Sequence, residues 1–545
     1  MPTPGGPSLA RTRPSTAPGC RLADVTAALG VPAAGDDAAV GLDGVTLDSR
    51  RVGPGDLYAA LPGSRAHGAR FVAQAVAAGA RAVLTDAQGE AIVRDLTGGG
   101  PTVPVVVVED PRAVLGEVSA LVYGRPAERL LMLGVTGTNG KTTVTFLLDA
   151  ALRALGRRTG LVGTIETRVV EERMRSVRTT PESTDVHGLL GLMVERGASV
   201  CSMEVSSHAL ALHRVDGIVF DVVAFTNLSR DHLDFHRTME DYFATKASLF
   251  TPDRARRGVV CVDDPWGRRL AATAGVPVQT LVTVTATGDG RDGEGADADW
   301  VVTDRRPEGA GTGFVLRGRD GTRVAARCPL PGDFNVTNTA VALVTLVLAG
   351  IGAEEAADAL AGSPPVPGRM ERVGAGSSPG EPLAVVDYAH TPDAVALALA
   401  SLRDRGRPLV VVLGAGGDRD REKRPLMGAA AARGADIVIV TDDNPRSEDP
   451  SAIRAAVLAG AQAVPGDGGH EAEVVEIADR RAAVAAAVAR AWGGGAVLVA
   501  GKGHEQGQET AGSVTTFDDR EVLAAALEAE AGRRAATTTQ EETTK

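Results

Sequence analysis

The chain has 545 residues, and its 57 Lys and Arg residues against 69 Asp and Glu residues give a formal net charge of −12. This length favours roughly three domains and excludes a single small binding module. The acidic balance disfavours a nucleic-acid partner, because the phosphates would be repelled, and it disfavours a nucleic-acid motor for the same reason. The partners are therefore expected to be small molecules.

Cysteine usage and hydropathy indicate the compartment. The four cysteines lie far apart without a C-x-x-C pair, so neither a disulfide framework nor a zinc site is predicted. The Pro- and Arg-rich start of the chain lacks the apolar region of a signal peptide. No stretch reaches the ~18 consecutive apolar residues of a membrane span. We expect a cytoplasmic protein without membrane insertion.

Short β-branched runs alternate with Ala- and Leu-rich helical patterns. This alternation is typical of parallel sheets, so the predicted fold class is α/β. The clearest predicted strands are residues 131–135, 222–225, 383–388, 409–414, 436–441 and 496–501.

Pro- and Gly-rich segments divide this pattern into domains. The predicted domains are residues 19–127, 128–367 and 368–530. Residues 1–18 and 531–545 lack hydrophobic periodicity and are predicted to be flexible tails. Within the middle domain, residues 287–299 are too polar and glycine-rich for a core, so they are predicted to be a loop insertion.

The sequence GVTGTNGKTT, starting at Gly134, follows the first of these strands and precedes an amphipathic helix. Glycines let backbone N–H groups surround phosphate oxygens, Lys141 supplies a cation, and the Thr142 hydroxyl can hold Mg²⁺. The usual pattern has glycine six places before the lysine, where this chain has Val135. A tight turn with a solvated lysine is the alternative, but the flanking strand and helix favour an ATP or GTP phosphate loop.

Polar residues follow the next strands. Glu204 ends one apolar run, and His232 follows another. Because ligands collect at the carboxyl ends of strands in open α/β sheets, these residues are candidates to hold Mg²⁺ beside the phosphate loop. Their alternative role is that of loop or capping groups. Lys246, on a predicted helix, would ordinarily be a solvated residue.

The ordered motifs GVTGTNGKTT, TTPES, MEVSSHAL, NLSRDHLDFH, DYAHTPDA, GAGGDRDREKRPLMG, DDNPR and GKGHE resemble the ATP-dependent Mur ligases of peptidoglycan synthesis. More narrowly, they resemble members that add the third residue of the stem peptide. The resemblance covers nearly the whole chain between the tails, and Val135 is usual for this family. It implies a small UDP-binding domain, a central P-loop domain and a C-terminal Rossmann-like domain.

The resemblance also implies roles for residues on the ATP side. The implied catalytic residues are Lys141, Glu204, His232, Lys246 and Asp387. Thr142, Glu204, His232 and Lys246 are the implied metal ligands, for two Mg²⁺ ions, with Lys246 as a carbamate formed from CO₂. The carbamate replaces a cation with an anion that can help to bind Mg²⁺. The implied ATP contacts are Thr138, Asn139, Gly140, Lys141, Thr142, Thr143, Asn335, Asn338 and Arg369. Helix capping is the alternative for the two later asparagines.

On the substrate side, the resemblance implies UDP-MurNAc-dipeptide contacts at Leu47, Ser49, Ser64, Arg65, Ala66, Thr179, Thr180, Ser206, Leu212 and Arg214. It implies a meso-diaminopimelate pocket at Arg419, Asp443, Asn444, Pro445, Arg446, Gly501 and Glu505. The DNPR sequence favours diaminopimelate over L-lysine, because Arg446 can pair with the distal carboxylate that lysine lacks. A surface arginine in a turn is the alternative.

The implied reaction is amide formation. The γ-phosphoryl group of ATP would pass to the D-Glu carboxylate of UDP-MurNAc-L-Ala-D-Glu, and the amine of diaminopimelate would attack the acyl phosphate. We expect a monomer in which the third domain closes over the second. The same ligase using L-lysine, a folylpolyglutamate-type ligase and a catalytically idle scaffold remain alternatives.

Overall fold

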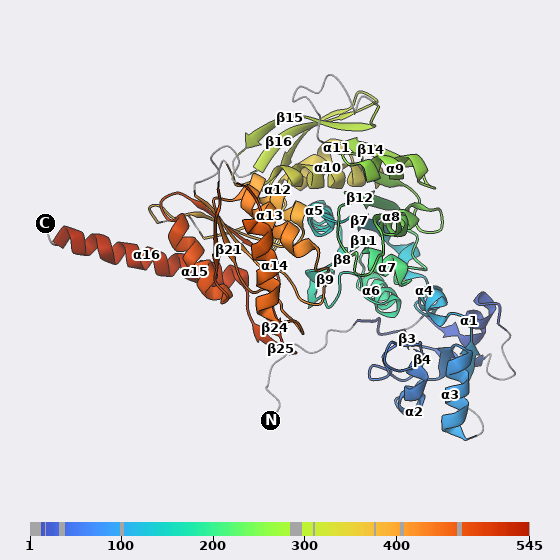
Figure 1. The fold of residues 1–545 in the computed structure, drawn as a ribbon. Coiled ribbons are helices and arrows are strands. Elements are labelled where there is room, and N and C mark those ends of the chain that lie inside the picture. The colour runs from blue at the N-terminus through green and yellow to red at the C-terminus, as the bar shows by residue number, and fades with distance from the viewer. Residues whose placement is uncertain are drawn as a thin grey trace.

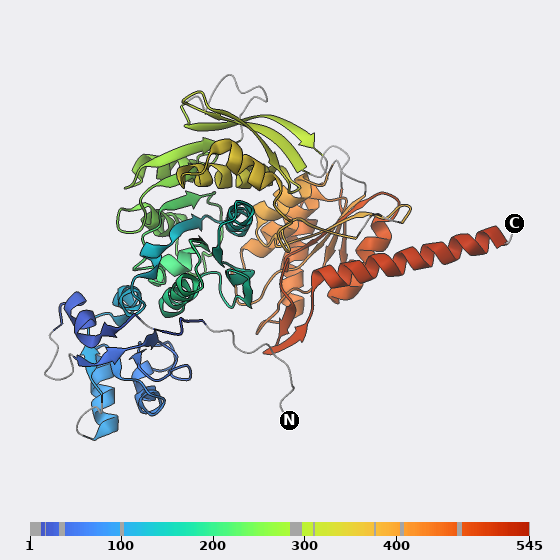
Figure 2. The ribbon, with the colours of Figure 1, turned by 180° about the vertical axis from the view of Figure 1, so that it is seen from behind.

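The computed structural model describes residues 12–16, 18–31, 39–98, 103–283, 297–308, 311–374, 376, 378–403, 408–465 and 471–543. Three α/β bodies follow one another along the chain, coloured blue, cyan through green to yellow, and orange to red (Figure 1). The first and third bodies flank the second on different sides, as the reverse view also shows (Figure 2). Each body holds one principal sheet, which confirms the α/β class and the predicted strands.

The N-terminal body has four parallel strands in the order β3-β4-β5-β6, beside the small antiparallel pair β1-β2. Because β3 and β4 are parallel neighbours, the loops that follow them lie at the same edge. Its elements are β1 (Cys20–Arg21), α1 (Leu22–Ala28), β2 (Gly41–Leu42), β3 (Gly44–Thr46), β4 (Asp56–Ala59), η2 (Gly68–Phe71), α2 (Val72–Ala77), β5 (Ala82–Thr85), α3 (Ala87–Thr97), β6 (Val105–Val107) and α4 (Pro111–Val122).

The central body contains a sheet in the order β10-β9-β8-β11-β7-β12-β13-β14-β15-β16-β17. Strands β8 to β15 across its middle are parallel, and antiparallel strands extend both edges. Its elements are η3 (Pro126–Arg129), β7 (Leu131–Thr136), α5 (Lys141–Ala154), β8 (Thr159–Val162), β9 (Glu166–Val169), β10 (Glu172–Arg175), α6 (Ser183–Glu195), β11 (Val200–Glu204), α7 (Ser207–Ala211), β12 (Val222–Phe225), α8 (Met239–Ala247), η4 (Ser248–Phe250), β13 (Gly258–Cys261), α9 (Pro265–Thr273), β14 (Val278–Val282), β15 (Trp300–Glu308), β16 (Gly311–Gly318), β17 (Arg323–Cys328), α10 (Asp333–Leu348) and α11 (Ala353–Ala361).

The C-terminal body contains a sheet in the order β18-β19-β23-β20-β21-β22, parallel except for β18. A hairpin, β24-β25, follows the sheet. Its elements are β18 (Glu371–Val373), β19 (Leu383–Asp387), α12 (Pro392–Ala400), β20 (Leu409–Leu413), α13 (Lys423–Gly434), β21 (Ile437–Val440), α14 (Pro450–Gln462), β22 (Glu473–Glu476), α15 (Arg480–Ala491), β23 (Ala496–Ala500), β24 (Gly507–Thr510), β25 (Ser513–Thr516) and α16 (Asp519–Thr543).

Several helices begin at a capping side chain followed by proline. The side chains of the N-cap residues accept hydrogen bonds from backbone N–H groups of the first turn, and proline tolerates that position because its missing N–H has no helical partner. This arrangement occurs at Asp110, Asp264, Thr391 and Asp449. The local sequence therefore fixes where these helices start.

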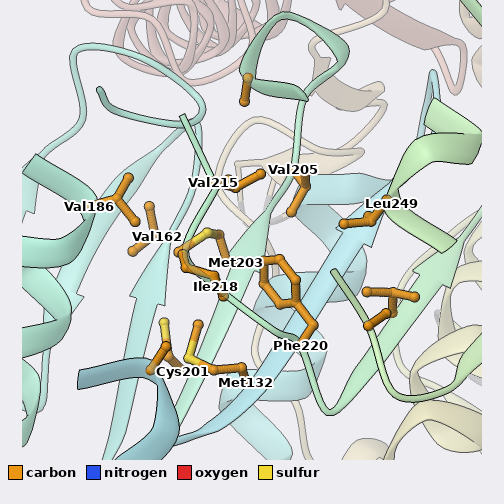
Figure 3. Close-up of a cluster of buried hydrophobic side chains, with 14 of the residues drawn as sticks. Met132, Val162, Val186, Cys201, Met203, Val205, Val215, Ile218, Phe220 and Leu249 are labelled. Atoms are coloured by element: carbon orange, nitrogen blue, oxygen red, sulfur yellow. The ribbon is translucent and has the colours of Figure 1, made fainter. Parts of the chain in front are cut away.

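The core of the central body lies on both faces of the sheet. Successive side chains of one strand point to opposite faces of the sheet, so Met132 joins one apolar cluster and Leu133 the other. Figure 3 shows Met132 beside Cys201, Met203 and Phe220 in the first cluster. Gly134 leaves room for the Phe220 ring, because a Cβ atom there would lie 2.9 Å from it. This packing holds β7 rigidly under the phosphate loop.

Residues 12–16, which we call the strap, correct the prediction of a flexible tail over residues 1–18. Arg13 Nη1 donates to Asp56 Oδ1 at 2.5 Å, and the Asp56 side chain is 1% exposed. At the other end of the strap, Ser15 Oγ donates to Glu195 Oε2 of α6 at 2.7 Å. The strap therefore contacts both the N-terminal and the central bodies.

The strap lies close to helix α6. A Cβ atom at Gly188 would come within 2.8 Å of the Thr12 carbonyl oxygen, and one at Gly191 would lie 3.2 Å from the Pro14 ring. Glycine at these positions lets the extended segment pack on the helix.

The C-terminal end also differs from the prediction. Residues 531–543, predicted to be a flexible tail, continue α16, and Arg533 and Arg534 form ion pairs with Glu530 one helical turn earlier. The helix extends away from the third body in both views (Figures 1 and 2). The predicted loop over residues 287–299 lies mostly outside the described residues. No helix in the described parts of the chain has the length and apolar character that crossing a membrane requires.

Candidate functional site

The phosphate loop joins β7 to α5 in the middle of the central sheet, between β11 and β12. Gly137 and Gly140 have φ angles of 147° and 87°, which side chains disfavour. Lys141 Nζ donates to the carbonyl oxygens of Gly137 at 3.0 Å and Thr138 at 2.8 Å. Asn227 supports the loop, since its Oδ1 accepts from the Asn139 N–H at 3.0 Å. The loop therefore has the form of an anion site at a helix N-terminus.

Glu204 lies beside this loop because it is the last residue of β11, in register with Val135 of β7. Its Oε2 accepts from Thr142 Oγ1 at 3.0 Å and from Thr164 Oγ1 at 2.9 Å. Its Oε1 accepts from the Thr164 N–H at 2.7 Å. Glu204 is fully buried, so these donors hold the carboxyl group in one orientation.

The donor set around Glu204 fits Mg²⁺. Magnesium prefers oxygen ligands, keeps several waters, and is commonly shared between one or two carboxylates and substrate phosphates. Across the described residues, no cluster of three or more His, Cys, Asp or Glu side chains is arranged to hold a metal alone. Thr142 and Glu204 would therefore hold the ion together with the nucleotide.

Lys246 lies on α8, and the structure excludes the solvated alternative. It is 1% exposed, and its Nζ donates to the Gly137 carbonyl oxygen at 2.8 Å. Burial, followed by the nearby charge of Lys141, holds the pKa of Lys246 well below its usual range. A lowered pKa favours the neutral amine, which is the nucleophilic form that can react with CO₂.

His232 follows β12 and has a left-handed backbone, with φ of 55°. Burial lowers the pKa of His232 to about 3, despite the neighbouring carboxylate of Asp231. The imidazole is therefore neutral at pH 7, which is the form that binds metals. Its ring stacks edge to face on that of His208, with centroids 5.0 Å apart.

Asp231 joins the central and C-terminal bodies. Its Oδ1 lies 3.4 Å from Lys423 Nζ, and its Oδ2 lies 3.7 Å from His390 Nε2. Both partners come from the C-terminal body. Burial opposes ionisation, but these neighbours and His232 hold the pKa of Asp231 well below its usual range. These contacts therefore connect the two bodies next to His232.

Arg369 reaches the phosphate loop from the start of the C-terminal body. Its Nη2 donates to Thr142 Oγ1 at 3.0 Å, and its guanidinium lies 4.3 Å from the Tyr388 ring centroid. Asp387 Oδ2 accepts from the Met370 N–H at 2.7 Å, which fixes the backbone next to Arg369. Burial raises the pKa of Asp387, against the opposing charge of Arg369.

The predicted asparagines lie on α10 and do not cap it, since Gly332 is the N-cap residue. Asn335 Nδ2 donates to the Pro331 carbonyl oxygen at 2.7 Å, and Asn338 Nδ2 donates to Asn335 Oδ1 at 2.9 Å. A Cβ atom on Gly140 would lie 2.3 Å from Asn338 Oδ1, so Asn338 touches the phosphate loop.

A cleft of about 870 Å³ lies between the central and C-terminal bodies. Its lining from the central body includes Thr164, Thr179 and His232. From the C-terminal body it includes six of the seven predicted amino-acid contacts, namely Arg419, Asp443, Asn444, Arg446, Gly501 and Glu505. Pro445, the seventh, is buried beneath them. The parallel register of the C-terminal sheet brings their loops to one edge.

Arg446 is partly buried in this cleft. Its Nη1 donates to the Gly417 carbonyl oxygen at 2.6 Å, and its Nε lies 3.7 Å from Glu509. Glu505 lies opposite, and Asn444 Nδ2 donates to its Oε2 at 2.7 Å. The cleft thus presents a carboxylate for an ammonium group and a guanidinium for a carboxylate.

The residues predicted to hold the muramoyl dipeptide lie near α6 and α7. Thr180 Oγ1 donates to the Glu204 carbonyl oxygen at 2.8 Å and lies 3.3 Å from Ser206 Oγ. Arg214 Nη2 lies 3.0 Å from Glu182 Oε1, and Leu212 caps the end of α7. Thr179 Oγ1 accepts from Thr164 Oγ1 at 3.0 Å, which connects this group to the carboxylate of Glu204.

The other predicted UDP-MurNAc-dipeptide contacts lie apart from the cleft, in the N-terminal body. Leu47 and Ser49 follow β3, and the exposed residues Ser64, Arg65 and Ala66 follow β4, so both loops meet at one edge of that sheet. Ser49 Oγ lies 3.5 Å from Gln74 Oε1. The structure brings these five residues to the same edge but not into contact with the phosphate loop.

The sequence interpretation gave no role to Thr164, His390, Lys423 or Lys502. Three of them lie within quoted motifs, DYAHTPDA, GAGGDRDREKRPLMG and GKGHE, which could have singled them out. Thr164 lies in none of the quoted motifs. Its role depends on β8 and β11 being neighbours, which the sequence alone does not show.

Comparisons with known proteins agree with this architecture. Three family models match the chain, described as the Mur ligase family, catalytic domain (residues 42–123), the Mur ligase middle domain (135–346) and the Mur ligase, glutamate ligase domain (368–503). The matched residues cover most of each of the three bodies.

Full-length relatives are similar along nearly the whole chain. A protein of Streptomyces coelicolor, named UDP-N-acetylmuramoyl-L-alanyl-D-glutamate--2,6-diaminopimelate ligase, is 52% identical over 97% of this chain and 99% of its own length. A protein of the same name from Corynebacterium glutamicum is 45% identical over 94% of this chain and 97% of its own length.

Solved structures show the same fold. A structure of a ligase with that name has a TM-score of 0.63 and 32% identity, covering 94% of this chain and 99% of its own. The folylpolyglutamate synthase of Mycobacterium tuberculosis has a TM-score of 0.55 and 20% identity, covering 72% of this chain and 92% of its own, which shows a shared fold alone. The sequence motifs, the three-body architecture and these relatives together show that the chain belongs to the Mur ligase family.

Proposed function

We propose that the chain is an ATP-dependent amide ligase that adds meso-diaminopimelate to the D-Glu γ-carboxylate of UDP-MurNAc-L-Ala-D-Glu in peptidoglycan precursor synthesis. The observation that carries the proposal is the cleft between the two bodies, where a mixed-charge amino-acid pocket on one body faces Thr164 and His232 of the other. Thr164 hydrogen bonds to Glu204, which in turn accepts from Thr142 of the phosphate loop. The full-length relatives with this name support the choice of substrates.

The chain's own residues would promote phosphoryl transfer by binding and orientation. The loop N–H groups and Lys141 would hold the ATP phosphates, and Arg369 would supply a second cation beside Thr142. Mg²⁺, held by Thr142 and Glu204, would neutralise charge on the transferring phosphoryl group. We further propose that Lys246 is a carbamate and that, with His232, it would hold a second Mg²⁺ ion.

Amide formation requires the amine to reach the acyl phosphate. We propose that the C-terminal body closes toward the phosphate loop, and that the contacts of Asp231 with His390 and Lys423 help to hold the two bodies together. Closure excludes water, which would otherwise hydrolyse the acyl phosphate. We propose that Glu505 receives an ammonium group of diaminopimelate and that Arg446 pairs with its distal carboxylate.

The alternatives have less support. A ligase that uses L-lysine would bring no second carboxylate to Arg446, whose ion pair in the structure is with Glu509. A folylpolyglutamate-type ligase is disfavoured, because the similarity to that enzyme is confined to the fold and leaves over a quarter of this chain unmatched. A catalytically idle scaffold would not need the ordered contacts of Glu204 and Lys246.

Phosphate release from ATP tests the proposal. The purified protein is supplied with Mg²⁺ and UDP-MurNAc-L-Ala-D-Glu, with either meso-diaminopimelate or L-lysine, and a Lys141→Met variant reports any contaminating ATPase. Release that depends on diaminopimelate is the expected result. Release with lysine alone would retain the ligase but refute the role of Arg446, and release with neither amino acid would favour a scaffold or another substrate.

A further inference from the structure

Lys502 lies beneath the amino-acid pocket and contacts no solvent. Its exposed fraction is 0%, and it follows β23 in the loop that also carries Glu505. A buried ammonium group is costly unless it is paired and hydrogen bonded, so its presence here requires a physical account.

The ammonium group connects three segments. Lys502 Nζ donates to Asn444 Oδ1 at 2.9 Å and to the Gly507 carbonyl oxygen at 2.7 Å. It also lies 3.3 Å from Asp443 Oδ1 and 4.0 Å from Glu505 Oε2. Its partners come from the loop after β21, its own loop and the β24-β25 hairpin.

These contacts determine how Asn444 is oriented. Asn444 Oδ1 accepts from both Lys502 Nζ and the Glu509 N–H, the latter at 3.0 Å. Because both acceptor positions of the amide oxygen are used, Nδ2 must point the other way, where it donates to Glu505. Lys502 thereby fixes the carboxylate that faces the cleft, through one intermediate side chain.

Lys502 also changes the charge of the pocket. Asp443 and Glu505 bring two carboxylates to the same edge, and burial raises the pKa of Glu505 while the charge of Lys502 opposes that rise. Loss of this cation would leave the cleft one unit more negative. Diaminopimelate is neutral overall at pH 7, whereas lysine carries one positive charge. The extra negative charge of the pocket would therefore weaken binding of diaminopimelate, which has an additional carboxylate, relative to binding of lysine.

We infer that Lys502 is a positioning and specificity-determining residue of the amino-acid pocket, which orients Asn444 and Glu505 and offsets their negative charge so that a dicarboxylic diamino acid is accepted. The inference rests on the proposed function. Because Lys502 is buried, it acts through these neighbours and not by touching the substrate.

The test compares the wild type with Lys502→Met, which removes both the charge and the donor, and with Lys502→Gln, which removes the charge and keeps a donor for Asn444. For K502M, we expect the KM for diaminopimelate to rise by at least about tenfold, the scale of one charge interaction at the effective dielectric of such a site. The KM values for ATP and for the UDP-linked dipeptide should stay within about twofold, because Lys502 contacts neither the phosphate loop nor the predicted UDP-linked dipeptide contacts. The ratio of kcat/KM for diaminopimelate to that for L-lysine should fall in both variants, because both remove the charge.

Distinct outcomes separate the possible failures. If the wild-type protein releases no phosphate with diaminopimelate, the proposed function fails, whatever the variants do. If the wild type is active and K502M keeps its amino-acid KM and preference, or if K502Q keeps the wild-type preference, the inference about Lys502 is overturned. Should K502M not fold in a thermal melt, Lys502→Gln removes the charge while keeping a donor for Asn444, and the same preference ratio decides.

Discussion

Arg13→Met is expected to loosen the N-terminal body, because it removes the cation of a buried ion pair. Asp56 is 1% exposed and accepts from the Arg13 guanidinium at 2.5 Å and from the Gly53 N–H at 2.7 Å. The variant loses the first of these two donors. Breaking a fully buried pair costs roughly 3–5 kcal/mol. Arg13 is 35% exposed, so water compensates in part, and a cost of about 1–3 kcal/mol is expected.

Amide hydrogen exchange of β3 and β4, followed by mass spectrometry at pH 7.5, measures this change locally. A cost of about 1–3 kcal/mol corresponds to roughly 5- to 150-fold faster exchange where local opening controls the rate. The double variant Arg13→Met/Asp56→Asn is the matched control, since it removes the stranded charge and should recover most of the protection. Equal protection in R13M and the wild type would refute the contribution of the pair.

The sign of the pH dependence follows from the carboxyl group. Burial already raises the pKa of Asp56, against the pull of Arg13, and loss of Arg13 would raise it further. When the pKa of a carboxyl group is higher in the folded than in the unfolded state, ionisation of the group at high pH lowers the free energy of unfolding. At a pH below both pKa values the group is protonated in both states, and this penalty disappears. The difference in melting temperature between R13M and the wild type should therefore shrink as the pH falls from 7.5 toward 4. A constant difference would contradict this explanation.

Three further changes concern the cleft. Lys246→Ala should lower kcat, measured by phosphate release, by at least about 100-fold, because the variant cannot form the proposed carbamate. In the same assay, CO₂-free buffer should lower the activity of the wild type, and added bicarbonate should restore it. Glu204→Gln should raise the Mg²⁺ concentration needed for half-maximal activity, measured by magnesium titration, whereas an unchanged titration would argue against a metal role. Arg446→Lys should raise the KM for diaminopimelate by about tenfold or more while leaving the KM for ATP unchanged, because a point charge cannot replace a bidentate pair.

Much of the fold could be predicted because its signals are local. The strand at residues 131–135, the glycine-bearing loop and the helix starting at Lys141 are encoded in one continuous stretch, and the structure has them as predicted. Glu204 could be placed near this loop because it ends an apolar run, a position that the register with Val135 confirms. The roles assigned to these residues stay predictions.

The parts that sequence reasoning missed depend on contacts between distant segments. Nothing local marks Lys246 as buried, since its helix has charged neighbours on the exposed side, and only packing against Gly137 reveals it. Asp231 similarly gains its partners from residues more than 150 positions later in the chain. The prediction of a flexible segment at the strap was wrong because its short sequence has no periodicity, whereas its contacts are with Asp56, Glu195 and α6, all distant in the chain.

A label on the long C-terminal helix can report movement of the third body. At 1.5 Å per residue, the 25 residues of α16 form a lever about 37 Å long, so a small rotation of that body produces a larger displacement at the tip. The chain's four cysteines, Cys20, Cys201, Cys261 and Cys328, are all buried. A fluorophore attached through Ala536→Cys, an exposed position, would therefore label this lever selectively and report opening and closing of the cleft during turnover.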